Sequence, residues 1–145
     1  IAYATNPAYF REQLLRRLGC GASDEIEAFQ FVTSHQSREY VGGVIRFARS
    51  PERFKTIENR FIMNRLVSDG HHYLSCLQVR DVHRGHGQGR ELFRRALGTV
   101  LERHDKAWGV VSDLNILHWH LSLGLGAKLH TSRDNAEQLW VVSWG

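Results

Sequence analysis

Three glycines, Gly85, Gly87 and Gly89, alternate between a segment that predicts a strand and a segment that predicts a helix. The strand pattern covers residues 73–79, and the helix pattern begins at residues 90–97. A glycine turn between a strand and a helix N-terminus brings several backbone N–H groups around one small volume, and the helix adds partial positive charge there. Because N–H groups in this arrangement bind phosphate, the segment predicts a phosphate-bearing ligand.

Strand and helix patterns follow one another along the rest of the chain. The expected strands are 1–5, 27–33, 40–48, 72–79, 107–114, 127–131 and 138–143. One expected helix follows Asn6-Pro7, and a second lies within 51–69. A third runs from the glycine turn to about residue 104, and a fourth begins at Asn115 as its N-cap. The pair Gly42-Gly43 indicates a β-bulge or a close backbone approach.

This element order predicts a mixed α/β (α+β) fold with one sheet packed by helices. The chain has 145 residues, of which 42% are hydrophobic, so it can bury a full core without disulfides or metals. No linker or repeat interrupts it, and we expect a single domain over residues 1–145.

The formal net charge of +4 suits an anionic ligand or an acidic partner. No long Lys/Arg run interleaves with aromatic residues, so nucleic acid is not the expected partner, although the arginine surplus leaves an RNA-linked acceptor as a weaker alternative.

The two cysteines, Cys20 and Cys76, predict reduced thiols and a cytoplasmic protein. No apolar run approaches the roughly 20 residues that cross a bilayer, and no signal-peptide pattern is present. Since the first residue is Ile1, we expect further residues to precede it.

Two familiar phosphate turns do not match this sequence. A Walker A loop requires Lys and then Ser or Thr after its last glycine, but Arg90-Glu91 stands there. A dinucleotide fingerprint has the spacing Gly-x-Gly-x-x-Gly, whereas the spacing here is Gly-x-Gly-x-Gly. Its acidic residue would also end a second strand, and Glu102 lies inside a predicted helix.

The segment from Arg84 to Gly89 resembles the Arg/Gln-x-x-Gly-x-Gly/Ala signature of the GNAT N-acetyltransferase superfamily. Asn115, which opens a helix pattern that ends at Leu125-Gly126, is similar to a second landmark of that family. The resemblance covers residues 72–131 by motif and the N-terminal half by element order. It implies a largely antiparallel central sheet, flanked by helices and splayed at the strand before the glycine turn.

The resemblance also implies acetyl-CoA, or another acyl-CoA, as co-substrate. In the family the glycine turn holds the CoA pyrophosphate, and the backbone of the preceding strand bonds the pantetheine arm. Glycines suit this role because they let the main chain approach phosphate oxygens, and arginines add charge. Ordinary surface charge is the alternative role for the arginines. The implied CoA-binding residues are Leu77, Val79, Arg84, Gly85, His86, Gly87, Gln88, Gly89, Arg90 and Asn115.

Acyl transfer to an amine requires a base for the ammonium and a proton for the leaving thiolate. The family's acid is commonly a tyrosine seven residues after the asparagine landmark, and Ser122 occupies that position, with His118 and His120 as alternatives. No glutamate stands in the strand before the turn, so His72 is the first candidate for the base and Tyr73 the second. A purely structural role in the strand is the alternative for both.

The function predicted from these features is an acyl-CoA-dependent N-acyltransferase. It would move an acetyl group by direct attack to an amine of a small molecule, peptide or protein, as a monomer or homodimer. A non-catalytic CoA-binding sensor is the alternative, motivated by Ser122 at the tyrosine position. The nine histidines lack the spacing of a zinc set, so no metal is expected. By the same resemblance, the N-terminal helix, the hairpin and residues 51–70 would form the acceptor surface.

Overall fold

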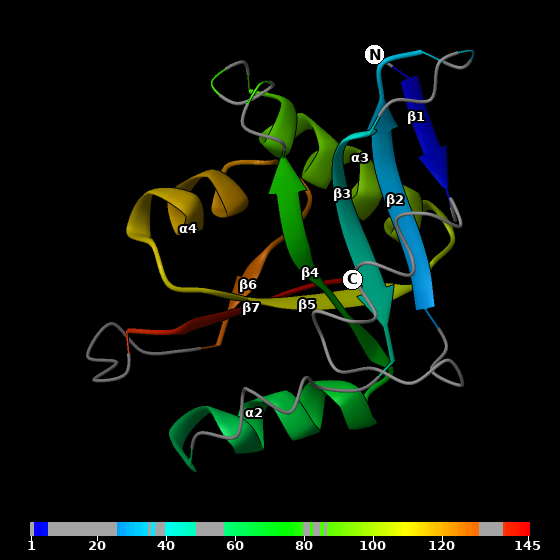
Figure 1. Ribbon diagram of the computed structural model, residues 1–145. Coiled ribbons are helices and arrows are strands. Elements are labelled where there is room, and N and C mark those ends of the chain that lie inside the picture. Colours follow the sequence, from blue (N-terminus) through cyan, green and yellow to red (C-terminus); the bar gives the residue numbers. More distant parts are fainter. Residues whose placement is uncertain are drawn as a thin grey trace. The chain divides into compact units, whose positions relative to one another are not determined.

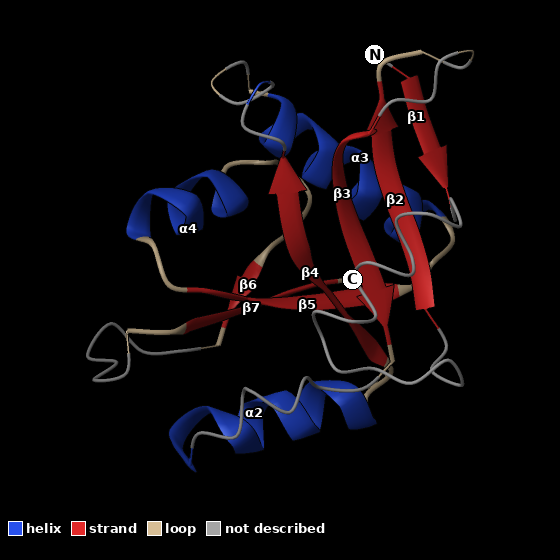
Figure 2. Cartoon of the chain, in the orientation of Figure 1, coloured by secondary structure: helices blue, strands red, loops and turns tan. Residues whose placement is uncertain are grey.

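A computed structural model gives the structure of the chain (Figures 1 and 2). It describes residues 2–5, 26–34, 36, 40–48, 57–79, 82, 85, 87–130 and 138–145. Its elements are β1 (Ala2–Thr5), β2 (Ile26–Val32), β3 (Tyr40–Phe47), α2 (Ile57–Ser68), β4 (His71–Val79), α3 (Gln88–Glu102), β5 (Lys106–Val111), α4 (Leu114–Leu121), β6 (Lys128–Leu129) and β7 (Trp140–Trp144).

The seven described strands belong to one sheet in the order β1-β2-β3-β4-β5-β7-β6. The pairs β1–β2, β2–β3, β5–β7 and β6–β7 are antiparallel, and β4–β5 is parallel. This confirms the predicted mixed α/β fold with a largely antiparallel sheet and accompanying helices. The chain divides into two compact units, unit 1 (Ile1–Phe47 and Leu74–Leu97) and unit 2 (Ala48–Tyr73 and Gly98–Gly145), so the single domain over 1–145 stays a prediction.

Unit 1 is built around the β2–β3 hairpin. Phe31 pairs with Gly42 and Val32 with Tyr40, so Val41 is an extra residue in β3. The bulge lies at Val41, next to the glycine pair, whereas Gly42 and Gly43 keep regular pairs with Phe31 and Gln30. The core contains fully buried strand residues, and the first part of α3 adds one apolar face. These buried residues are Ala28, Phe29, Val44, Ile45, Leu92, Phe93, Ala96 and Leu97.

An arginine of α3 packs on aromatic rings in unit 1. The guanidinium carbon of Arg95 lies 5.1 Å from the ring centroid of Tyr3 and 5.9 Å from that of Phe31. The ring of Tyr3 also meets that of Phe31 edge to face, with centroids 6.2 Å apart. Cation–π attraction therefore joins this helix to β1 and β2, and it gives Arg95 a structural role.

Unit 2 has an aromatic core on β4, β5 and β7. Tyr73, Trp108 and Trp144 are essentially inaccessible to solvent, and the ring centroids of Tyr73 and Trp108 lie 4.8 Å apart. Helix α2 contributes buried Met63 and Leu66, and α4 contributes buried Leu117 and His120. Burying rings of this size is the main source of stability available to a unit of this length.

Several predicted boundaries shift in the structure. The helix expected within 51–69 is Ile57–Ser68. The strand expected over 107–114 is Lys106–Val111, because the side chain of Asp113 caps α4 by accepting from the backbone N–H groups of Asn115 and Ile116. The prediction of Asn115 as N-cap was therefore wrong by two residues.

The helix predicted after Asn6-Pro7 lies outside the described residues. In the described part of the chain, the helices are too short and too polar to cross a membrane.

Candidate functional site

The glycine turn adopts the left-handed backbone that its composition predicts. Gly85 has φ 85° and Gly87 has φ 70°, values that side chains other than glycine rarely tolerate. A Cβ atom added at either position would meet no heavy atom within 4 Å. The main chain is therefore uncovered on this side, as the approach of a phosphate requires. Arg84 and His86 lie outside the described residues.

Helix α3 begins directly at this turn. Its first bond runs from the backbone N–H of Glu91 to the carbonyl of Gly87, 3.1 Å apart, so Gly87 is the N-cap. The N–H groups of Gln88 and Gly89 consequently have no acceptor within the helix. The side-chain oxygen Oε1 of Gln88 is buried and has no hydrogen-bond partner. Two glycines, a helix N-terminus and an unsatisfied amide thus meet in unit 1.

An ion pair offsets the one acidic side chain in the first turn of α3. The carboxylate of Glu91 accepts from Nε of Arg94 at 3.0 Å and from Nη2 at 2.5 Å. These hydrogen bonds hold the pKa of Glu91 below its ordinary value. Glu91 is therefore ionised, and the guanidinium of Arg94 reduces the repulsion that it would exert on an anion at this helix end.

Strand β4 precedes the turn and carries two predicted contacts. The backbone of Leu77 and Val79 is part of β4, and their side chains lie outside the described residues. The described ladder between β4 and β5 consists of His71–Tyr73 paired with Lys106–Trp108, although β4 continues to Val79. The remaining residues of β4 belong to unit 1, so the splay itself stays a prediction.

The predicted proton donor, Ser122, is the C-cap of α4. Its hydroxyl donates to the carbonyl oxygen of Trp119 at 2.9 Å, and its backbone N–H donates to the carbonyl of His118 at 3.0 Å. The side chain is exposed, but its hydroxyl proton is already used in the hydrogen bond that caps the end of α4. This geometry favours a capping role, because a proton transfer would first have to break that bond.

The two base candidates differ in exposure. His72 is partly exposed at its place in β4, whereas Tyr73 is fully buried against Trp108. A phenol in that position could meet a substrate only by leaving the core, so burial favours His72. The neighbouring His71 is buried and lies 3.2 Å from the carbonyl of Leu66 through Nδ1, and burial lowers its pKa.

His120, an alternative candidate for the proton donor, is buried among the aromatic rings of unit 2. It is 7% exposed, and its ring meets those of Trp119 and Trp144 edge to face at centroid distances of 4.3 and 5.5 Å. Desolvation lowers its pKa to about 4, so the ring is neutral at neutral pH. A neutral imidazole cannot donate the proton that a protonated one would, and this weakens His120 as an alternative acid.

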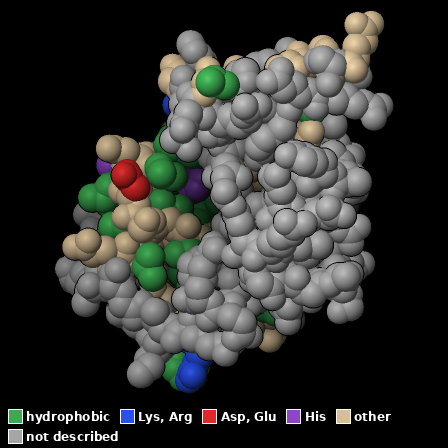
Figure 3. All heavy atoms as spheres, in the orientation of Figure 1, with side chains coloured by type: hydrophobic (Ala, Val, Ile, Leu, Met, Phe, Trp, Pro, Cys, Tyr) green, Lys and Arg blue, Asp and Glu red, His purple; other side chains and the backbone are tan. Residues whose placement is uncertain are grey.

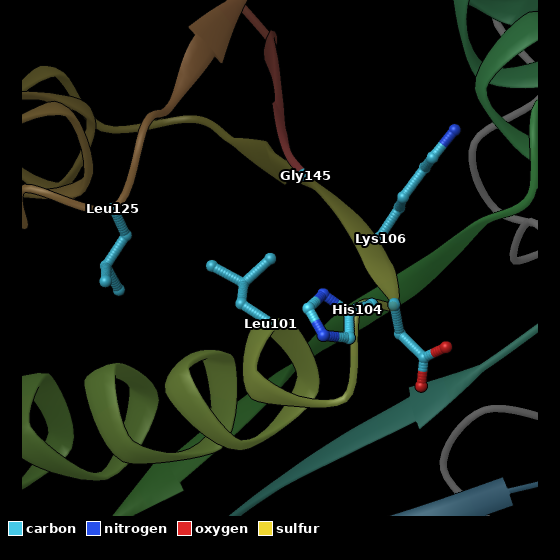
Figure 4. A pocket seen from close by; sticks show the side chains of 6 residues that line it. Leu101, His104, Lys106, Leu125 and Gly145 are labelled. Atoms are coloured by element: carbon cyan, nitrogen blue, oxygen red, sulfur yellow. The ribbon is translucent and has the colours of Figure 1, made fainter.

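Unit 2 also contains a hollow of about 370 Å³ (Figure 4). In Figure 4 the side chains of Leu101, His104 and Leu125 project into the space between α3 and the segment before β6. None of the predicted site residues is among its lining residues, which are Leu101, His104, Asp105, Lys106, Leu125 and Gly145. Among the described residues, no cluster of three His, Cys, Asp or Glu side chains could hold a metal ion.

No protein-family model and no curated protein matches this chain. Its structure does match solved structures over nearly the full length. An acyl-CoA N-acyltransferase from Pseudomonas aeruginosa is 11% identical, with a TM-score of 0.58 and coverage of 99% of both chains. An acetyltransferase of the GNAT family from Staphylococcus aureus is 10% identical, with a TM-score of 0.53 and coverage of 99% of this chain and 98% of that one.

A third match is NAA60 from Arabidopsis thaliana in complex with acetyl-CoA. It is 13% identical, with a TM-score of 0.51 and coverage of 99% of this chain and 97% of that one. At identities this low the likeness shows the fold, and it agrees with the fold implied by the sequence motifs.

The backbone of the turn can be tested with two matched substitutions. Gly87→Ala should destabilise the protein by about 1–2 kcal/mol, because φ 70° strains an alanine. Gly98→Ala, in the interior of α3 where an added Cβ meets nothing, should stabilise it by roughly 0.5–1 kcal/mol. Urea unfolding measures both. Equal effects of the two substitutions would contradict the left-handed turn.

Acid should destabilise the protein through His120. Its folded pKa of about 4 lies below the ordinary 6.5, so the unfolded chain binds the proton more readily. Stability is therefore unaffected above pH 6.5 and falls as the pH drops toward 4, by about 2 kcal/mol at pH 5. His120→Phe keeps an aromatic ring and should flatten this part of the pH profile.

Proposed function

We propose that this chain, which has the fold of the GNAT acyl-CoA N-acyltransferases, transfers an acetyl group from acetyl-CoA to an amine. The observation that carries the proposal is the turn at Gly85 and Gly87, where two left-handed glycines with open space beside them lead directly into the N-terminus of α3. This arrangement suits a pyrophosphate. The Arabidopsis protein of the same fold was solved with acetyl-CoA, which supports the choice of donor.

In this proposal the backbone N–H groups from Gly85 to Arg90 hold the pyrophosphate, and Arg84 and Arg90 add positive charge. The Arg94–Glu91 pair keeps the carboxylate of the first turn from repelling the ligand. The backbone of Val79 and the start of α4 at Asn115 would bond the pantetheine arm. The protein's share of the chemistry would then be to place the thioester carbonyl and leave it accessible to an amine.

The chemical step would be a direct attack. The amine nitrogen forms a bond to the thioester carbonyl carbon, His72 removes a proton from the nitrogen, and the carbon–sulfur bond breaks. The leaving thiolate then takes up a proton. We propose His72 as the base because it is the more exposed of the two candidates on β4. Water would supply the proton to the thiolate, since the hydroxyl of Ser122 is donated to Trp119.

Donor binding can be tested by thermal unfolding with acetyl-CoA. At 100 times its Kd the ligand should stabilise the fold by about 2.7 kcal/mol. Gly87→Glu should abolish this stabilisation, because a carboxylate would occupy the phosphate space. Gly70→Glu is the matched control: Gly70 is also left-handed, with φ 89° and open space beside it, and it lies on the turn after α2.

The two variants carry the same added charge and a similar backbone strain. The control should therefore lose stability without ligand but keep the acetyl-CoA response. The proposed donor site is wrong if millimolar acetyl-CoA does not shift the unfolding of the unmodified protein, or if both variants lose the response equally.

A non-catalytic CoA sensor is the second candidate, favoured by the hydrogen bond that removes Ser122 from proton transfer. Thiol release from acetyl-CoA with a panel of polyamines, amino-acid amides and short peptides separates the two candidates. For an enzyme, His72→Gln should lower turnover about 100-fold without weakening acetyl-CoA binding. Ser122→Ala should leave turnover nearly unchanged. Binding without turnover on every amine would favour the sensor.

A further inference from the structure

Helix α2 exposes an aromatic ring with an arginine stacked on it. Phe61 is 66% exposed, the highest value among the large hydrophobic residues of the described helices. The guanidinium carbon of Arg60 lies 5.1 Å from the centroid of the Phe61 ring. The opposite face of α2 is buried through Asn59, Met63 and Leu66, so Phe61 points away from the core of unit 2. Both side chains are exposed, so they are accessible to a partner.

Among the described side chains, the same face carries two arginines. The exposed side chains of α2 include Arg60 and Arg65, and the described side chains of this helix, residues 59–68, include no carboxylate. Among the residues that the structure describes, neither guanidinium forms an ion pair. By contrast, Arg46 and Arg94 of unit 1 are each paired with a glutamate.

Two lysines extend this charge onto the neighbouring strands of unit 2. Burial lowers the pKa of His130, and the charges of Arg65 and Lys128 lower it further. Burial likewise lowers the pKa of His71, and the charges of Lys106 at the start of β5 and Lys128 in β6 lower it further. The carboxylate that acts on His71 in the opposite direction is that of Asp69, in the turn after α2.

We propose that the exposed face of α2, with Phe61 between Arg60 and Arg65, binds an acidic polypeptide segment that carries an apolar side chain among its carboxylates. The apolar side chain would pack on the Phe61 ring, and the carboxylates would pair with the two guanidinium groups. Arginine and aromatic residues together are the usual energetic centres of protein interfaces. Arginine also suits carboxylates because its planar fork can donate two parallel hydrogen bonds.

A polypeptide partner fits this face better than a nucleic acid does. Single-stranded nucleic acids are bound by successive bases stacking on several aromatic rings along a basic groove. Here one exposed ring stands on a convex helix, and Arg60 already covers one side of it. Charge complementarity therefore selects a partner with both carboxylates and an apolar group. The proposal concerns binding and does not depend on acyl transfer.

Fluorescence anisotropy can test this with a short labelled peptide in which Asp and Glu flank a central Leu-Phe pair. At low salt the peptide should bind, and affinity should fall as salt rises, since exposed charges are screened over about 10 Å at 0.1 M. Arg60→Glu and Arg65→Glu should each weaken binding at least about tenfold. Arg103→Glu is the matched control, because it changes the net charge equally from an exposed position at the end of α3.

Phe61→Ala tests the apolar half of the surface and should weaken binding while leaving its salt dependence unchanged. Leu114→Ala, at an exposed position of α4, is its control and should have no effect. All of these side chains are exposed, so circular dichroism should show folded variants. Three results would overturn the proposal: no binding of the peptide at low salt, an equal loss in Arg103→Glu, or displacement of the peptide by a single-stranded oligonucleotide that binds more tightly.

Discussion

The backbone conformation at Gly85 and Gly87 is the constraint on which the proposed donor site depends. Only a left-handed residue reverses the chain at this point, and the carbonyl of Gly87 still accepts the first hydrogen bond of α3. The helix therefore starts within one residue of the turn. In the proposed donor site, its N-terminal N–H groups would face the space that the glycines leave open. An ordinary loop would separate these two features and weaken the electrostatic case for a phosphate.

Periodicity identified α3 well, because one strong pattern determined both its type and its limits. Leu92, Phe93, Ala96, Leu97 and Val100 are all buried, whereas Arg94 and Arg95 between them are exposed. Helix α2 was predicted with looser limits, since Phe61 matches the apolar spacing but faces solvent. Phe61 lies on the exposed face of α2, and a helical pattern of apolar residues alone cannot distinguish a core position from a binding position.

The N-cap of α4 was predicted at the wrong residue. Asp113 and Asn115 are both good capping residues, and the family landmark drew attention to Asn115. In the structure the carboxylate of Asp113 caps the helix, and Asn115 is the second helical residue. The role of Ser122 was also beyond prediction. Its hydroxyl bonds a carbonyl three residues earlier, a contact that depends on where the helix ends.

Burial decides which positive charges of unit 2 are available to a partner. Burial lowers the pKa values of His71, His120 and His130, so these rings are neutral near pH 7 and contribute no net charge. The charge of the α2 face comes instead from the guanidinium groups of Arg60 and Arg65. The stability of the core that supports α2 declines in acid, as His120 becomes protonated. The charge of the α2 face and the acid sensitivity of unit 2 thus depend on different residues, since Arg60 and Arg65 are exposed and His120 is buried.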